Sequence, residues 1–185
     1  YKMCGIAGFV DDSGDGEKTL SAMLKAIAHR GPDASKIFIS QNVHLGHNRL
    51  SIIDLSSDAD QPMHDSGLTI VYNGEIYNYI ELRTELERNG EIFKTKSDTE
   101  VILKAYQQWG EKCVEHFVGM WAFALWDKNE NKLFCSRDRF GIKPFYYINN
   151  NNKFYFGSEY KALKPTPVFS NEINQYQVLR GLQMG

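Results

Sequence analysis

Residues 119–127 read GMWAFALWD, and the run from Trp121 to Trp126 is almost continuously apolar instead of alternating with polar residues. Three further short strands are predicted after it along the chain, over residues 132–136, 144–148 and 153–157, with Asn- and Lys-rich hairpin turns as connections. A hairpin-connected strand that is apolar on both sides must be covered on both faces. The pattern therefore predicts an α+β fold in which two antiparallel sheets pack face to face with helices outside them.

The first part of the chain mixes strands with amphipathic helices. Strands are predicted over residues 4–10, 36–40, 43–53 and 68–72, and helices over residues 18–29, 78–89, 97–110 and 159–163. Asn73-Gly74 is expected to end the fourth of these strands. Ser97 and Glu100 have the spacing of a capping box, which predicts where the third helix begins.

Composition excludes several classes of function. The 185 residues suffice for one domain with a hydrophobic core. The net charge of −2 does not favour binding to nucleic acid or to a membrane surface. No apolar stretch approaches the roughly 20 residues that span a bilayer, and no signal peptide is visible. Three widely spaced cysteines without a CxxC pattern argue against a disulfide framework or a zinc site. These features predict a cytoplasmic protein in a reducing compartment.

Cys4 follows Met3, a residue that resembles a translation start. Removing Met3 would leave Cys4 with a free α-amine, whose reference pKa of roughly 8 is close to the roughly 8.5 of the thiol. The amine could then take the thiol proton and free the thiolate to attack a carbonyl carbon. The alternative is a small buried hydrophobe at the start of a strand. The preceding Tyr1-Lys2 resembles a cloning remnant, and it would block the amine if it were retained.

Five polar or small residues stand out at predicted element ends, and each has an ordinary structural explanation. Arg49 could protect a strand edge, Asn73-Gly74 could form a hairpin turn, and Asp98 could complement a helix dipole. Glu75 could be a solvated surface charge. Taken together with a thiol, they offer one cation, two carboxylates and two oxyanion donors. That set suits a ligand with an α-carboxylate, an α-ammonium and a side-chain carbonyl, and free glutamine is such a molecule.

A series of motifs strengthens this interpretation. In chain order they are MCGIAG (3–8), HRGPD (29–33), RLSI (49–52), YNGEIYN (72–78), SDTE (97–100), RDRFGIKP (137–144) and GSE (157–159). Together they resemble the class II glutamine amidotransferase domain of the N-terminal-nucleophile hydrolases, and within it the glutaminase domain of glutamine-hydrolysing asparagine synthetases. The resemblance covers residues 3–163 and implies a four-layer αββα sandwich. Residues 164–185, where Pro165 and Pro167 interrupt any periodicity, are expected to form a linker or tail toward an absent synthetase domain.

The resemblance also implies residue roles. Cys4 would be the nucleophile with its own α-amine as base, and the oxyanion hole would use the Asn73 side chain and the Gly74 N–H. Arg49 would bind the glutamine α-carboxylate, and Glu75 and Asp98 would hold the α-ammonium. Backbone groups of Leu50, Ser51, Ile52 and Ile53 would line the pocket. The loop at residues 29–33 is a candidate lid. This half-reaction needs no metal or cofactor, and ATP and Mg²⁺ are expected only in the absent synthetase domain.

The implied function is hydrolysis of L-glutamine to L-glutamate and ammonia, which supplies ammonia for the ATP-dependent amidation of a carboxylate. Aspartate is the expected acceptor, and a sugar acid of surface-polysaccharide biosynthesis is the alternative. Two other hypotheses stay open: a non-catalytic glutamine-binding regulatory module, and an amidohydrolase acting on other amides. The expected partners are L-glutamine and a synthetase domain in cis or in trans. Nucleic acid and membranes are not expected, and a homodimer stays open.

Overall fold

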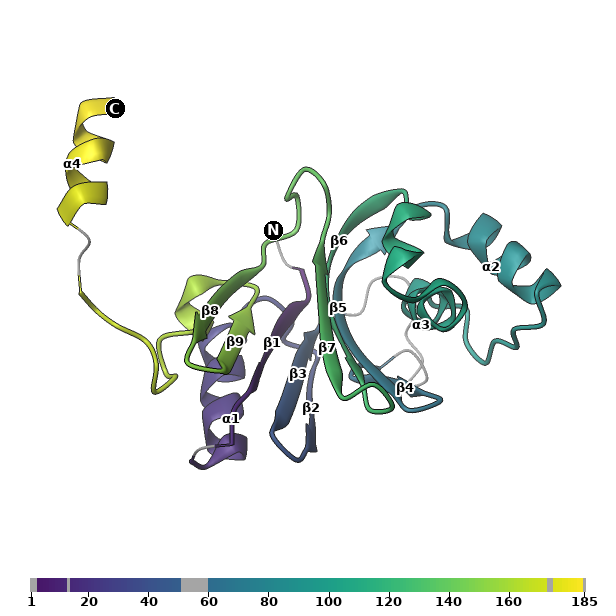
Figure 1. The fold of residues 1–185 in the computed structure, drawn as a ribbon, viewed down its shortest axis with the longest axis horizontal. Coiled ribbons are helices and arrows are strands. Elements are labelled where there is room, and N and C mark those ends of the chain that lie inside the picture. Colours follow the sequence, from purple (N-terminus) through teal and green to yellow (C-terminus); the bar gives the residue numbers. More distant parts are fainter. Residues whose placement is uncertain (1–2, 13, 51–59, 173–174, 185) are drawn as a thin grey trace.

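The computed structural model describes residues 3–184 except 13, 51–59 and 173–174, and two antiparallel sheets stand face to face in it (Figure 1). The first sheet has the order β2-β3-β1-β9-β8, with β1 Gly5–Val10, β2 Ala34–Ser40, β3 Val43–Arg49, β8 Tyr146–Asn150 and β9 Lys153–Gly157. The second has the order β4-β5-β6-β7, with β4 Met63–Asp65, β5 Leu68–Ile76, β6 Gly119–Asp127 and β7 Lys132–Arg137. The predicted two-sheet architecture is confirmed.

Helices cover the outer face of each sheet, which completes the αββα sandwich (Figure 1). Helix α1, Gly16–Ala26, packs on β1 and β3 of the first sheet. Helices α2, Tyr79–Arg88, and α3, Asp98–Trp109, lie on the second sheet. Short 3-10 turns follow at Gly110–Glu115 and Tyr160–Ala162. A last helix, α4, Gln175–Met184, stands apart from the two sheets.

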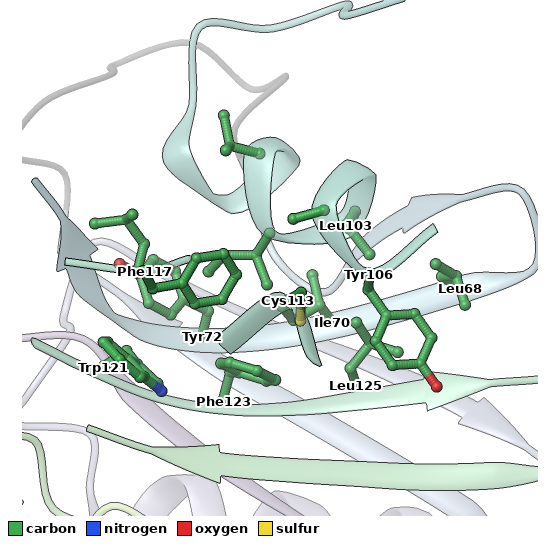
Figure 2. Close-up of a cluster of buried hydrophobic side chains, with 14 of the residues drawn as sticks. Leu68, Ile70, Tyr72, Leu103, Tyr106, Cys113, Phe117, Trp121, Phe123 and Leu125 are labelled. Carbon is green, nitrogen blue, oxygen red and sulfur yellow. The ribbon is translucent and has the colours of Figure 1, made fainter. Parts of the chain in front are cut away.

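Strand β6 has the apolar run because both of its faces are buried. Trp121, Phe123 and Leu125 pack under the helices of the second sheet, in the cluster that Figure 2 shows. Ala122 and Ala124 face the other sheet, where their small side chains belong to the core between the two sheets. Alternate residues of a single strand therefore fill two separate layers of the core.

The structure corrects two boundary predictions. Asn73-Gly74 does not end a strand, because β5 continues to Ile76 and pairs with β6 along its whole length, from Leu68 opposite Asp127 to Ile76 opposite Gly119. The strand predicted over 43–53 ends at Arg49, and residues 51–53 lie outside the described part of the chain.

The tail also differs from its prediction. Residues expected to lack periodic structure include helix α4, and Val168 and Phe169 pack against the cluster under α1. The predicted domain boundary at Leu163 stays a prediction.

The predicted capping box is half confirmed. Ser97 caps α3 by accepting a hydrogen bond from the Thr99 N–H at 3.1 Å. Glu100 does not return to the Ser97 N–H as a capping box requires. Its carboxylate accepts instead from the N–H groups of Lys94 (2.8 Å) and Thr95 (2.7 Å) and from the Thr95 hydroxyl (2.7 Å). The residue therefore closes the loop before the helix.

Replacing this carboxylate should cost stability. Glu100→Ala leaves three donors without their acceptor at a side chain that is only 4 % exposed. We expect a loss of about 2–4 kcal/mol in the free energy of unfolding, measured with urea, and a smaller loss for Glu100→Gln, whose amide oxygen still accepts. Glu85→Ala, on the exposed face of α2, is the matched control and should change stability by less than about 0.5 kcal/mol. Equal losses in the two alanine variants would contradict this account.

Candidate active site

Strand alternation points a group of polar side chains of the first sheet at the second sheet. On β3, Val43 and Leu45 belong to the core between the sheets, so His47 and Arg49 continue the same face. Cys4 lies two residues before Ile6, which also belongs to that core, at the start of β1. The thiol, the imidazole and the guanidinium therefore gather at one end of the space between the sheets.

Strand β5 contributes the opposite wall. Val71 lies in the core between the sheets, so Asn73 and Glu75 continue that face toward the first sheet. Tyr72 points the other way, and its hydroxyl donates to the Asp98 carboxylate at the start of α3 at 2.8 Å. The sequence YNG thus supplies one side chain to each face of the sheet, followed by a glycine that has no side chain.

These residues enclose a cavity of ≈ 660 Å³. A volume of this size is typical of small-molecule sites. Its walls include all the predicted site residues that the structure describes: Cys4, Arg49, Leu50, Asn73, Gly74, Glu75 and Asp98. Ser51, Ile52 and Ile53 lie outside the described residues. The walls also include Met3, His47, Gln61 and Lys143, to which the sequence analysis assigned no role.

The Cys4 thiol lies against the backbone of Leu50. Its Sγ accepts a hydrogen bond from the Leu50 N–H at 3.4 Å and lies 3.6 Å from the Leu50 carbonyl oxygen. Burial raises the pKa of the thiol above its ordinary value, although the Leu50 N–H and the charges of Arg49 and Lys143 act in the opposite direction. A thiol with a raised pKa needs a base before it can act as a nucleophile.

Asn73 presents an unpaired donor. Its side chain is 3 % exposed, and within the described residues its Nδ2 has no hydrogen-bond partner. Leaving a buried amide donor unpaired costs about 1–3 kcal/mol, so such a group calls for a ligand or a function. In the wall of a cavity that also holds a thiol, an acceptor oxygen on a bound carbonyl compound would satisfy it.

The Gly74 N–H lies on the same open side of β5. The N–H groups of Tyr72 and Ile76, two residues to either side, point away from β6 and donate to Gln61 Oε1 (2.5 Å) and to Asp98 Oδ2 (3.1 Å). Because N–H directions alternate along a strand, the Gly74 N–H points away from β6 as well. Only glycine fits here, since a Cβ would come within 2.4 Å of a backbone carbonyl oxygen of β6.

Two carboxylates line the cavity, Asp98 at the start of α3 and Glu75 on β5. Asp98 accepts from the Tyr72 hydroxyl and the Ile76 N–H, and Glu75 also lines the cavity. Burial raises the pKa of Asp98 above its ordinary value, and the negative charge of Glu75 acts in the same direction. A bound ammonium group would relieve both effects, which suits the predicted role of this pair.

Arg49, the predicted receptor for an α-carboxylate, already contacts a carboxylate. Its Nη1 forms an ion pair with Asp60, which also pairs with Lys36 at 2.6 Å. Burial acts to raise the pKa of Asp60, but the two cations outweigh it and hold the pKa below its usual range. Asp60 was missed because it lies in a polar stretch that the sequence marks only as a loop. A substrate carboxylate must therefore share or displace this contact.

His47 is a second residue that the sequence analysis did not assign, although the interruption of an apolar strand by His47-Asn48-Arg49 marks the place. The imidazole is 2 % exposed and lines the cavity. Burial and the charge of Arg49 lower the pKa of His47 to about 4, so the ring is neutral at physiological pH. Its nitrogens make no well-formed hydrogen bond within the described chain, although the Tyr72 carbonyl lies near the ring.

The loop at residues 29–33 is tied to the start of β1. Arg30 Nε donates to the Cys4 carbonyl at 3.0 Å, and its Nη1 pairs with Glu159 at 3.2 Å. His29 Nε2 also contacts Glu159 at 2.8 Å. None of the residues of this loop is among those that line the cavity. The proposal that it acts as a lid stays a prediction, to be tested by hydrogen exchange with and without a glutamine analogue, where equal exchange would count against it.

The described residues contain no group of three or more His, Cys, Asp or Glu side chains placed to hold a metal ion. None of the helices in the described part of the chain is long and apolar enough to cross a membrane.

Comparison with known proteins agrees with this geometry. Residues 3–184 match the family described as "Glutamine amidotransferase domain". The chain is 43 % identical over 172 residues to Asparagine synthetase [glutamine-hydrolyzing] 3 of Bacillus subtilis, covering 89 % of this chain and 28 % of that protein. It is 44 % identical over 182 residues to a putative asparagine synthetase [glutamine-hydrolyzing] 2 of Methanocaldococcus jannaschii, covering 87 % and 35 %. The chain thus spans about a third or less of these relatives.

Solved structures share the fold at lower identity. A glutamine phosphoribosylpyrophosphate amidotransferase from B. subtilis superposes with a TM-score of 0.74 at 21 % identity, over 87 % of this chain and 43 % of that one. A chain described as the allosteric regulatory enzyme of purine biosynthesis gives a TM-score of 0.76 at 20 % identity, over 88 % and 43 %. At this identity the likeness shows the fold alone.

Proposed function

Because this chain belongs to the glutamine amidotransferase domain family, we propose that it hydrolyses L-glutamine to L-glutamate and ammonia, with Cys4 as the nucleophile. One observation supports this most directly. The buried, unpaired Asn73 amide and the Gly74 N–H lie in the same cavity as the Cys4 thiol. A nucleophile and two hydrogen-bond donors in one cavity are the groups that acyl transfer requires.

The first half of the reaction joins the substrate to the chain. The free α-amine of processed Cys4 takes the thiol proton, and Sγ forms a bond to the side-chain amide carbon of glutamine. The electron pair of the C=O bond moves to oxygen, where Asn73 and Gly74 donate to the oxyanion. When the carbonyl re-forms, the C–N bond breaks, and the proton held by the amine leaves with the nitrogen as ammonia.

Water completes the cycle. It attacks the γ-glutamyl thioester with the α-amine again accepting a proton, the C–S bond breaks, and glutamate and the thiol are released. The substrate is held by its other end: Arg49 binds the α-carboxylate beside Asp60, and Glu75 and Asp98 bind the α-ammonium. Each charged group of free glutamine then meets a group of opposite charge.

The ammonia is proposed to serve a synthetase domain. Relatives named as glutamine-hydrolysing asparagine synthetases are much longer than this chain, which matches 28 % and 35 % of two of them. We assign to this domain the supply of ammonia for amidation of aspartate, with ATP and Mg²⁺ bound by a synthetase domain in cis or in trans.

A substrate panel tests the proposal. The chain beginning at Cys4 is expected to release ammonia from L-glutamine and much less from N-acetylglutamine, which lacks the ammonium group that Glu75 and Asp98 would bind. Saturable glutamine binding without ammonia release would indicate a regulatory module. Similar rates on both compounds would indicate an amidohydrolase that does not require a free amino acid.

Asp98→Asn should weaken glutamine binding without lowering the stability of the fold. The amide oxygen can still accept from Tyr72 and Ile76, but the charge that binds the α-ammonium is lost. We expect KM for glutamine to rise at least about tenfold, a loss that corresponds to roughly 1.4 kcal/mol, with a smaller effect on kcat.

The same variant should not lose stability at neutral pH. Burial raises the pKa of Asp98 in the folded state. The folded protein therefore loses stability as the pH rises above the unfolded-state pKa of that carboxyl, about 3.9. The variant should therefore gain relative to the parent between about pH 4 and pH 7, measured by urea unfolding in the absence of glutamine. A KM equal to that of the parent would contradict the assigned role.

A further inference from the structure

Lys143 places a buried ammonium group at the first residues of the chain. It lies in the loop between β7 and β8, which rises beside the N-terminal end of β1 (Figure 1). The residue is 6 % exposed, lines the cavity, and brings its Nζ to 3.1 Å from the Met3 Sδ. Within the described residues no carboxylate forms an ion pair with it, in contrast to the buried Lys104, which pairs with Asp65 and Glu91. A buried charge without a paired carboxylate needs an explanation.

The backbone of the loop fixes this position. The Asp138 carboxylate accepts from the N–H groups of Ile142 (2.8 Å) and Lys143 (2.9 Å). Arg137 Nε donates to the Lys143 carbonyl at 2.6 Å. Both peptide groups of Lys143 are therefore held by side chains of the segment that leads into the loop. The ammonium stands at the cavity as part of a built structure, and not as a free surface side chain.

The other charges near Cys4 are largely compensated. Arg30 pairs with Glu159, and Arg49 pairs with Asp60. The titratable and charged groups that face this end of the cavity are Arg30 and Glu159 on the connecting loops, His47 and Arg49 on β3, Asp60, Tyr72 and Glu75 on β5, and Asp138. Burial and the charge of Arg30 lower the pKa of Lys143, while Cys4, Glu75 and Asp138 act to raise it.

We propose that Lys143 is a positioning residue that, after Met3 is removed, holds its charge beside the α-amine of Cys4 and keeps that amine unprotonated. A like charge within about 4–6 Å disfavours the protonated form of an amine, and a positive charge favours a thiolate. The same ammonium therefore acts on both members of the nucleophile–base pair in the productive direction. This inference rests on the proposed function, and it assigns a role to the RDRFGIKP motif that the hydrolysis steps leave without one.

The pH dependence of kcat/KM tests the proposal in the chain that begins at Cys4. Lys143→Met keeps the length of the side chain and removes the charge, so the acidic limb of the profile should move up by about one pH unit or more. Lys143→Arg should retain most of the parental profile. Lys18→Met, on the exposed face of α1 at the end away from Cys4, is the matched control and should change nothing. An unchanged or lowered acidic limb in Lys143→Met overturns the proposal.

A second readout does not depend on turnover. The rate at which iodoacetamide alkylates Cys4, followed by peptide mass spectrometry across pH, reports the thiolate fraction directly. Lys143→Met should move this profile to higher pH by a similar amount, while its urea midpoint stays near that of the parent. If no preparation releases ammonia but the alkylation profile moves, the proposed function fails and the role of Lys143 stands. If the alkylation profile does not move, the role of Lys143 fails, whatever the glutaminase rate.

Discussion

A chain that begins at Cys4 should hydrolyse glutamine at least about 10²-fold faster than the chain that begins at Tyr1. In the longer chain the nitrogen of Cys4 is an amide and cannot accept the thiol proton, and general base catalysis contributes about 10²–10⁴-fold. Because burial raises the pKa of the thiol, the thiol stays protonated when it has no base. Met3 also lines the cavity, and its removal clears space beside the nucleophile.

The measurement is ammonia release by two preparations whose N-termini are confirmed by intact mass. Cys4→Ala in the shorter chain is the control and should abolish release, because no other thiol is available: Cys113 is buried and burial raises its pKa to about 12, as it does for Cys135. Equal rates in the two preparations would show that the α-amine is not the base.

Asn73→Ala should lower kcat by about 10²–10³-fold while glutamine binding changes little. The Nδ2 donor is buried and has no partner within the described residues. It therefore contributes a hydrogen bond only when an oxyanion forms. The fold should not suffer, because no hydrogen bond to Nδ2 is lost. The comparison is made by steady-state ammonia release together with glutamine binding measured in a Cys4→Ala background.

Asn48, on β3 of the first sheet, provides a matched control. It is as buried as Asn73, but it points at α1, where its Nδ2 donates to the Leu24 carbonyl at 2.9 Å. Asn48→Ala should therefore lower the free energy of unfolding by about 1–3 kcal/mol and leave kcat near that of the parent. If Asn73→Ala lost stability in the same way and kept its kcat, Asn73 would be a structural residue.

The architecture could be predicted from sequence because β6 carries a local signal. A strand that is apolar on both sides and flanked by hairpin turns is expected to lie between two covering layers. The end of β5 could not be predicted in this way. Asn73-Gly74 has the local signature of a turn, and only pairing with β6, more than forty residues away, keeps it extended. Tertiary pairing overrides turn propensity there.

The same distinction between local and long-range signals applies to the site residues. Cys4, Arg49, Asn73 and Asp98 were found because each lies in a motif whose residue types suit one ligand, and the structure brings them to one cavity. Asp60 and Lys143 were missed because their importance lies in contacts with residues 11 and 140 positions away. A pattern read along the chain carries no signal for such pairs.

The place of β1 has a consequence for how proteins of this kind are assembled from genes. β1 is the middle strand of its sheet, and Cys4, the proposed nucleophile just before it, lines the cavity between the two sheets. A polypeptide that stayed joined in front of Cys4 would cap the amine that the proposed mechanism uses as its base. If the α-amine of Cys4 is the base, a module fused in front of this domain must be cleaved off before the site can act, whereas a module fused behind it leaves the amine free. The same reasoning applies in the laboratory, where purification tags belong at the C-terminal end.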